Sequence, residues 1–237
     1  MYDLVVTTQI IINVFEILGA VIGIFYLTKY RDDQLSRYFV YYLWFTVSVE
    51  LVFGWLPASI FYLDFFSFLR GTLFEDNIWI YNIYQVISYG FYLFYFSSLI
   101  EDKKNARYAG FLFIIYLFLA ILNLIFSGIF FEAISSFTDI LGTLLLLFSV
   151  IYFYFQLLKS DKILNFYKNI PFYVSIGALV FHLVVNPIFI YDTYYSNSKS
   201  EEFVEIQRII LTLANIFMYT CYILGFIVCS KKNKSYY

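Results

Sequence analysis

The chain has 237 residues, of which 62% are apolar and only 14% are charged, and its formal net charge is −2. Soluble domains carry roughly a quarter charged residues, so a water-soluble fold could not hide this much apolar surface and lipid must be the solvent for much of it. The slightly acidic balance also excludes the basic field of a nucleic-acid-binding protein.

Long apolar runs follow one another along the chain. A membrane-spanning helix needs about 20 mainly apolar residues, and runs that are continuous rather than alternating favour helices over a β-barrel. Seven runs qualify, which predicts an all-α, polytopic membrane protein with one domain over residues 1–237. The predicted spans are Leu4–Leu27, Tyr38–Ile60, Ile78–Ile100, Tyr108–Phe126, Ile134–Leu158, Pro171–Tyr191 and Ile206–Cys229.

Basic residues fall on alternate connections between these runs. Lys and Arg are retained on the cytoplasmic side of a membrane, so the pattern predicts an inner-membrane protein with its N-terminus extracytoplasmic and its C-terminus cytoplasmic. The residues that carry this pattern are Lys29, Arg31, Arg37, Lys103, Lys104, Arg107, Lys159, Lys162, Lys168, Lys231, Lys232 and Lys234.

The second connection differs from the others in being rich in phenylalanine. Its segment Phe61–Arg70 is too apolar for a free loop and too short to span a membrane. This composition predicts a short amphipathic helix lying in the outer membrane interface.

Polar side chains recur at three- or four-residue spacing on five of the runs. Such groups are expensive at membrane depth and usually face the interior of a helix bundle, so they predict a polar cavity that opens outward. The candidate ligand-binding residues are Glu16, Glu50, Asn82, Gln85, His182, Asn186, Arg208 and Asn215. Glu16, Glu50 and His182 would form its floor, and Arg208 would stand at its mouth. The alternative interpretation is that these groups only hydrogen-bond one helix to another.

The fourth run contains only Asn123 as a comparable polar group, which predicts a peripheral position for it. The runs on either side show weak similarity. Glu50 occupies a position like that of His182, and Gln85 one like that of Asn215, which suggests a 3+1+3 duplication with a site between the halves. Glu16-Ile17-Leu18-Gly19 also matches Asp139-Ile140-Leu141-Gly142, although the predicted depths of the two acids differ by about 12 Å at 1.5 Å per residue.

Motifs for a metal-dependent protease, a phosphate-binding loop or a redox cysteine pair are absent, so the sequence predicts no cofactor and no metal, and an enzyme is the less favoured class. Three short segments, Tyr81-Asn82-Ile83-Tyr84, Ser160-Asp161-Lys162-Ile163-Leu164-Asn165 and Phe172-Tyr173-Val174-Ser175-Ile176-Gly177, carry a resemblance to small, uncharacterised seven-helix membrane proteins of Flavobacterium-like bacteria. The resemblance implies a stand-alone seven-helix protein that works beside signalling proteins, and it supplies no binding or catalytic residues.

The leading functional hypothesis is therefore a receptor-like or accessory membrane protein. A small ligand or cation would bind in the outward-facing cavity, and helix movement would reach a protein partner in the membrane or at the basic cytoplasmic face. Two alternatives remain open: a small-molecule or proton-coupled transporter, and a structural subunit of a larger membrane complex.

Overall fold

The computed structural model describes the backbone of residues 2–194 and 201–231, and the side chains of residues 6–161, 163–190 and 203–231. Lys199 and the basic tail beyond Lys231 lie outside the described residues. Throughout the described backbone the regular elements are helices. They are α1 (Tyr2–Lys29), α2 (Gln34–Val49), the π-helical turn η1 (Glu50–Gly54), α3 (Leu56–Tyr62), the 3₁₀ helix η2 (Asp64–Leu69), α4 (Ile78–Ser97), α5 (Lys103–Phe126), the 3₁₀ helix η3 (Ile129–Phe131), α6 (Ser136–Lys159), the 3₁₀ segment η4 (Asp161–Lys168), α7 (Ile170–Tyr194) and α8 (Glu201–Ser230).

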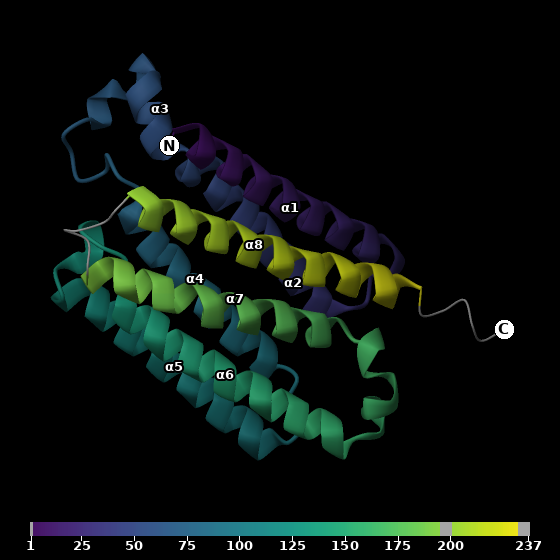
Figure 1. Ribbon diagram of the computed structural model, residues 1–237. Helices are drawn as coiled ribbons and strands as arrows, with labels where there is room; N and C mark the ends of the chain where they lie inside the picture. The colour runs from purple at the N-terminus through teal and green to yellow at the C-terminus, as the bar shows by residue number, and fades with distance from the viewer. Residues whose placement is uncertain (1, 195–200, 232–237) are drawn as a thin grey trace.

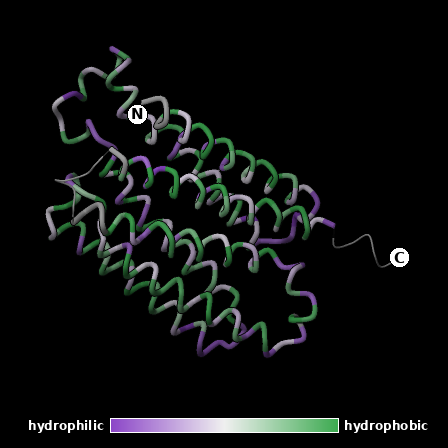
Figure 2. The backbone as a smooth tube through the Cα atoms, viewed as in Figure 1, coloured by the Kyte–Doolittle hydropathy of each residue, from purple (hydrophilic) through white to green (hydrophobic). Residues whose placement is uncertain are grey.

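Six helical segments are long and apolar enough to cross a membrane, which makes this a multi-pass membrane protein. They are Val6–Lys29, Gln34–Tyr62, Lys103–Phe126, Ser136–Lys159, Ile170–Ile190 and Phe203–Ser230. Hydrophobic residues run along the lengths of the helices, and hydrophilic residues gather toward the two ends of the bundle (Figure 2). The count differs from the predicted seven, because the run at 78–100 forms α4 but is not among the six.

The helices lie nearly parallel, with α1, α8, α7 and α6 in one row and α2, α4 and α5 behind it (Figure 1). Neighbouring pairs are α1–α2, α2–α4, α4–α6, α6–α7, α7–α8 and α8–α1, so six of the described helices close into a ring. Helix α5 packs outside this ring against α4 and α6. Its buried residues are only Tyr116, Ala120 and Leu124, which confirms the peripheral position predicted for the fourth run.

Helix α4 is the most aromatic wall of the ring. Tyr89, Tyr92 and Tyr95 are each no more than 2% exposed, and Phe91 stacks on Tyr42 of α2 with ring centroids 4.2 Å apart. Neighbouring helices therefore surround much of α4, and its polar groups contact protein rather than hydrocarbon. Tyrosine, asparagine and glutamine lower its mean hydropathy, which explains why α4 is not among the six most apolar segments.

The second predicted span does not form one continuous α-helix. Pro57 lies in the first turn of α3, and proline has no N–H and clashes with the carbonyl four residues earlier. The chain accommodates this by widening into the π turn η1 from Glu50 to Gly54. The carbonyl of Phe53, four residues before Pro57, instead accepts a hydrogen bond of 3.1 Å from Asn77 Nδ2.

The phenylalanine-rich connection after α3 forms a short helix, as predicted, although of the tighter 3₁₀ type. Phe65 and Phe68 on this helix are 79% and 69% exposed. Arg70 fastens the segment to the end of α3 by donating to the carbonyl oxygens of Ile60 and Phe61, both at 2.9 Å.

Candidate functional site

A cavity of about 360 Å³ lies inside the six-helix ring, and all six helices of the ring or their extensions contribute to its lining. It reaches Ile78 at the start of α4 and Ile134 just before α6 at one end, and Tyr92 of α4 at the other. A volume of this size is at the lower end of the range for small-molecule sites.

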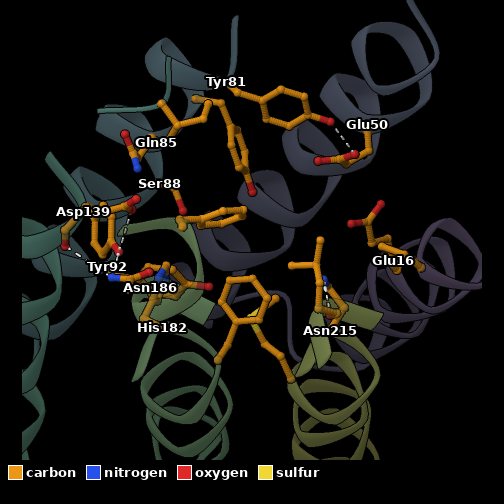
Figure 3. A pocket seen from close by; sticks show the side chains of 18 of the residues that line it. Glu16, Glu50, Tyr81, Gln85, Ser88, Tyr92, Asp139, His182, Asn186 and Asn215 are labelled. Atoms are coloured by element: carbon orange, nitrogen blue, oxygen red, sulfur yellow. Dashed lines mark hydrogen bonds between the residues drawn. The ribbon is translucent and has the colours of Figure 1, made fainter. Parts of the chain in front are cut away.

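Two carboxyl groups lie on one side of the cavity, Glu16 on α1 and Glu50 in η1 (Figure 3). Tyr219 OH donates to Glu16 Oε1 at 3.3 Å, whereas Glu16 Oε2 is buried without a hydrogen-bond partner. Glu50 Oε2 accepts from Tyr81 OH at 2.8 Å and from Gln9 Nε2 at 3.1 Å. Helices α1, α4 and α8 thus orient the two acids by hydrogen bonds to one oxygen of each.

The π turn decides where the Glu50 carboxyl lies. A Cβ atom on Gly54 would meet Glu50 Oε2 at 2.9 Å and Tyr81 OH at 3.2 Å. The absence of a side chain at Gly54 therefore leaves the space that the carboxyl group and its tyrosine partner occupy.

A second polar group lies across the cavity on α4, α6 and α7 (Figure 3). Tyr89 OH donates to Asp139 Oδ1 at 3.3 Å and lies 2.8 Å from Thr143 Oγ1. Asn186 Nδ2 donates to the same tyrosine hydroxyl at 2.8 Å. The His182 ring packs on the Tyr89 ring with centroids 4.5 Å apart. Asp139 Oδ2 is buried without a hydrogen-bond partner.

At the end of the cavity nearer Lys29 and Ser230, hydrogen bonds of tyrosine hydroxyl groups join the helices and close the bundle. Tyr42 OH lies 2.6 Å from Ser88 Oγ, and Tyr92 OH lies 2.7 Å from Tyr222 OH. Phe39 packs against Tyr222 at 5.0 Å between ring centroids and continues the closure toward that end.

Six of the eight predicted ligand-binding residues line this one cavity. They are Glu16, Glu50, Gln85, His182, Asn186 and Asn215. Arg208 is not part of the lining, and its Nε is buried without a hydrogen-bond partner.

Asn82 also lies outside the lining, and its amide is fully used elsewhere. Its Nδ2 donates to the carbonyl oxygens of Phe130 and Ala133, both at 3.0 Å, and its Oδ1 accepts from the N–H of Ser135 at 2.9 Å. Asn82 therefore fixes the connection between α5 and α6 to the ring.

Asp139 is the main lining residue that the sequence argument left out of its site. It is 3% exposed and lines the same cavity as Glu16, although the two acids lie at different distances from the ends of their helices. The shared Asp/Glu-Ile-Leu-Gly segment was the signal that could have found it. The tyrosines that contact the acids are Tyr81, Tyr89 and Tyr219. They were not among the predicted site residues, because with 25 tyrosines in the chain the residue type alone does not mark a site.

Comparison of the chain with protein-family models, with curated proteins and with solved structures finds no match. Among the described residues there is also no group of three or more His, Cys, Asp or Glu side chains arranged to hold a metal ion. The cavity is therefore the feature of the structure that bears most directly on function.

Proposed function

We propose that this protein is a receptor-like or accessory protein of the inner membrane, which binds a small ligand in its central cavity and acts through a partner in the membrane or at the cytoplasmic face. The observation that carries the proposal is the placement of buried carboxyl groups from separate helices around one cavity. Glu16 and Asp139 are each 3% exposed, and each keeps one oxygen without a hydrogen-bond partner. Groups that served only to join helices would be expected to use both oxygens.

The proposal includes α4 as a seventh span and an extracytoplasmic N-terminus. Helix α4 has 20 residues and lies parallel to the six apolar spans (Figure 1), a length that matches the hydrocarbon core of a membrane. Lys29 ends α1 and Lys159 ends α6, while Lys103 begins α5. In a seven-span arrangement all three lie on one side, which is the cytoplasmic side by the distribution of positive charge. The similarity to small seven-helix proteins of Flavobacterium-like bacteria also remains a proposal.

The closed layer under the cavity favours a receptor over an open passage. The Tyr42–Ser88 and Tyr92–Tyr222 contacts join α2 to α4 and α4 to α8. A ligand that changes the spacing of these helices would shift their cytoplasmic ends without opening a path through the membrane. Ligand binding would then shift the balance between two conformations of the bundle, which is how a receptor transmits a signal.

Accessibility of a thiol in the cavity tests this arrangement. In a background with Cys221 and Cys229 replaced by alanine, we expect the Ser88→Cys variant to react with a cationic, membrane-impermeant methanethiosulfonate added outside intact cells. Ser88 is buried in the protein but lines the cavity, where a hydrated thiol can ionise and react. Mass spectrometry of the purified protein measures the modified fraction.

The matched control is the Ser48→Cys variant, which carries the same change on the exposed outer surface of α2. That thiol would face hydrocarbon, where the reactive thiolate is disfavoured, so it should stay unmodified. An unreactive Ser88→Cys variant, in protein that remains folded, would mean that the cavity is sealed. The polar groups would then be interhelical contacts, as in a structural subunit.

The ring arrangement favours one alternative, a carrier. Three helices before α5 and three after it form the ring, and this is the order expected of a 3+1+3 duplication with a site between two halves. A carrier must also admit its substrate from the cytoplasmic side. Purified protein in proteoliposomes should therefore give no flux of a ligand that it binds if it is a receptor, and saturable flux would support the carrier.

A further inference from the structure

The charge inside the cavity points to the class of ligand, and this inference rests on the proposed function. Glu16, Glu50 and Asp139 all line the cavity, and among its described lining residues there is no Lys or Arg. The one basic side chain there, His182, packs between aromatic rings at 4.5 Å from Tyr89 and 5.8 Å from Tyr92. The acids therefore have no cationic protein partner in the site.

Each of the three acids is held in the same manner. One oxygen accepts a tyrosine hydroxyl, from Tyr219 to Glu16, from Tyr81 to Glu50 and from Tyr89 to Asp139. The second oxygen of Glu16 and the second oxygen of Asp139 accept no hydrogen bond. A tyrosine donor fixes the direction of each carboxyl group, and the other oxygen, which is buried, lacks a hydrogen-bond donor from the protein.

The aromatic rings of the cavity add a surface that also suits a cation. Tyr42, Tyr84 and Tyr92 also line the cavity. The face of a tyrosine ring attracts a cation and also packs against an apolar chain. The combination of carboxylates with aromatic faces suits an organic cation, and it does not suit an anion, which three acids would repel.

A metal cation fits less well than an organic one. The acids come from opposite sides of the cavity (Figure 3), and no three His, Cys, Asp or Glu groups in the described part of the chain converge as metal ligands would. A volume of about 360 Å³ also far exceeds that of a single ion. We propose that the cavity binds a protonated organic amine, with its ammonium group on the unpartnered oxygen of Glu16 or of Asp139 and its apolar body against the tyrosine rings.

Three compounds of similar size and different charge test the inference. Phenethylamine, 2-phenylethanol and 3-phenylpropionate carry an ammonium, a hydroxyl and a carboxylate on similar bodies. We expect phenethylamine alone to raise the thermal unfolding temperature of the full chain in detergent micelles, because a ligand that binds only the folded state stabilises it. It should also slow modification of the Ser88→Cys variant.

Variants of the acids show whether the protein recognises the positive charge of the amine. At least one of the variants Glu16→Gln and Asp139→Asn should weaken phenethylamine binding about tenfold or more in calorimetric titrations, because it removes the partner of a desolvated charge pair. The matched control is Glu132→Gln, an exposed carboxylate on the connection before α6, which should leave the affinity unchanged.

The outcomes separate this inference from the proposed function. Equal stabilisation by phenethylamine and 2-phenylethanol, or unchanged phenethylamine affinity in both acid variants, would overturn the amine class. Protection of the Ser88→Cys variant by the alcohol or the carboxylate would then leave the ligand-binding cavity standing with a different ligand. Failure of all three compounds, while external reagent still modifies that variant, would also overturn the amine class and retain an accessible cavity.

Discussion

The Gly142→Ala variant should lose both stability and the polar group around Asp139. A Cβ atom at position 142 of α6 would lie 2.4 Å from the ring of Tyr89 on α4. Tyr89 is 1% exposed and hydrogen-bonds toward Asp139 and Asn186, so any movement of its ring disturbs these contacts. Overpacking of a filled core costs about 1–3 kcal/mol, and we expect thermal unfolding in detergent to occur at a clearly lower temperature.

The control for this prediction makes the same substitution where space is open. Gly110 lies in α5 with nothing within 4 Å of its Cβ position. Because alanine is the better helix former by about 1 kcal/mol, the Gly110→Ala variant should be as stable as the parent protein or slightly more stable. Equal unfolding temperatures for the two variants would show that α4 and α6 do not approach each other as described.

The Asn82→Ala variant should destabilise the bundle without removing a cavity residue. Three backbone groups of the α5–α6 connection would lose their partner, namely the carbonyls of Phe130 and Ala133 and the N–H of Ser135. Each buried group left unsatisfied costs about 1–3 kcal/mol, although water at the helix ends will recover part of this. We expect a loss of about 2–4 kcal/mol in reversible unfolding with a denaturing detergent.

Asn123 offers a matched comparison on the neighbouring helix. Its Oδ1 accepts one hydrogen bond of 2.8 Å from Ser135 Oγ, so Asn123→Ala should lose less stability than Asn82→Ala. A different outcome is that Asn82→Ala unfolds like the parent protein but binds phenethylamine weakly. Asn82 would then contact ligand, as the sequence predicts, and would not hold the α5–α6 connection.

Much of the architecture could be predicted because hydrocarbon imposes simple demands on sequence. A helix facing lipid must be apolar over about 20 residues, and α1, α5, α6, α7 and α8 meet this test. The faces of the helices that point toward the inside of the bundle were also predictable. Glu16, Gln85, His182 and Asn215 were placed inward from their spacing, and all four line the cavity.

The remaining features depend on contacts that no single segment reveals. Other helices enclose much of α4, so it carries more polar residues than the six apolar segments, and its own hydropathy does not show how it is enclosed. Asn82 has the same spacing as cavity residues but turns toward backbone groups on the α5–α6 connection. Asp139 was left out of the predicted site because it lies in the first turn of its helix, and the sequence does not show that the cavity extends to that turn.

Pro57 has an effect that extends beyond its own turn. Five residues of the widened segment η1 set the direction in which α3 leaves the bundle, and one of them is Glu50, whose carboxyl is part of the cavity wall. An α-helix turns by about 100° per residue, so tightening η1 by one residue would swing α3 and the phenylalanines of η2 around the axis of α2. The orientation of α3 and η2 is therefore coupled to the position of the Glu50 carboxyl, so a change in that orientation reports a change in conformation around Glu50.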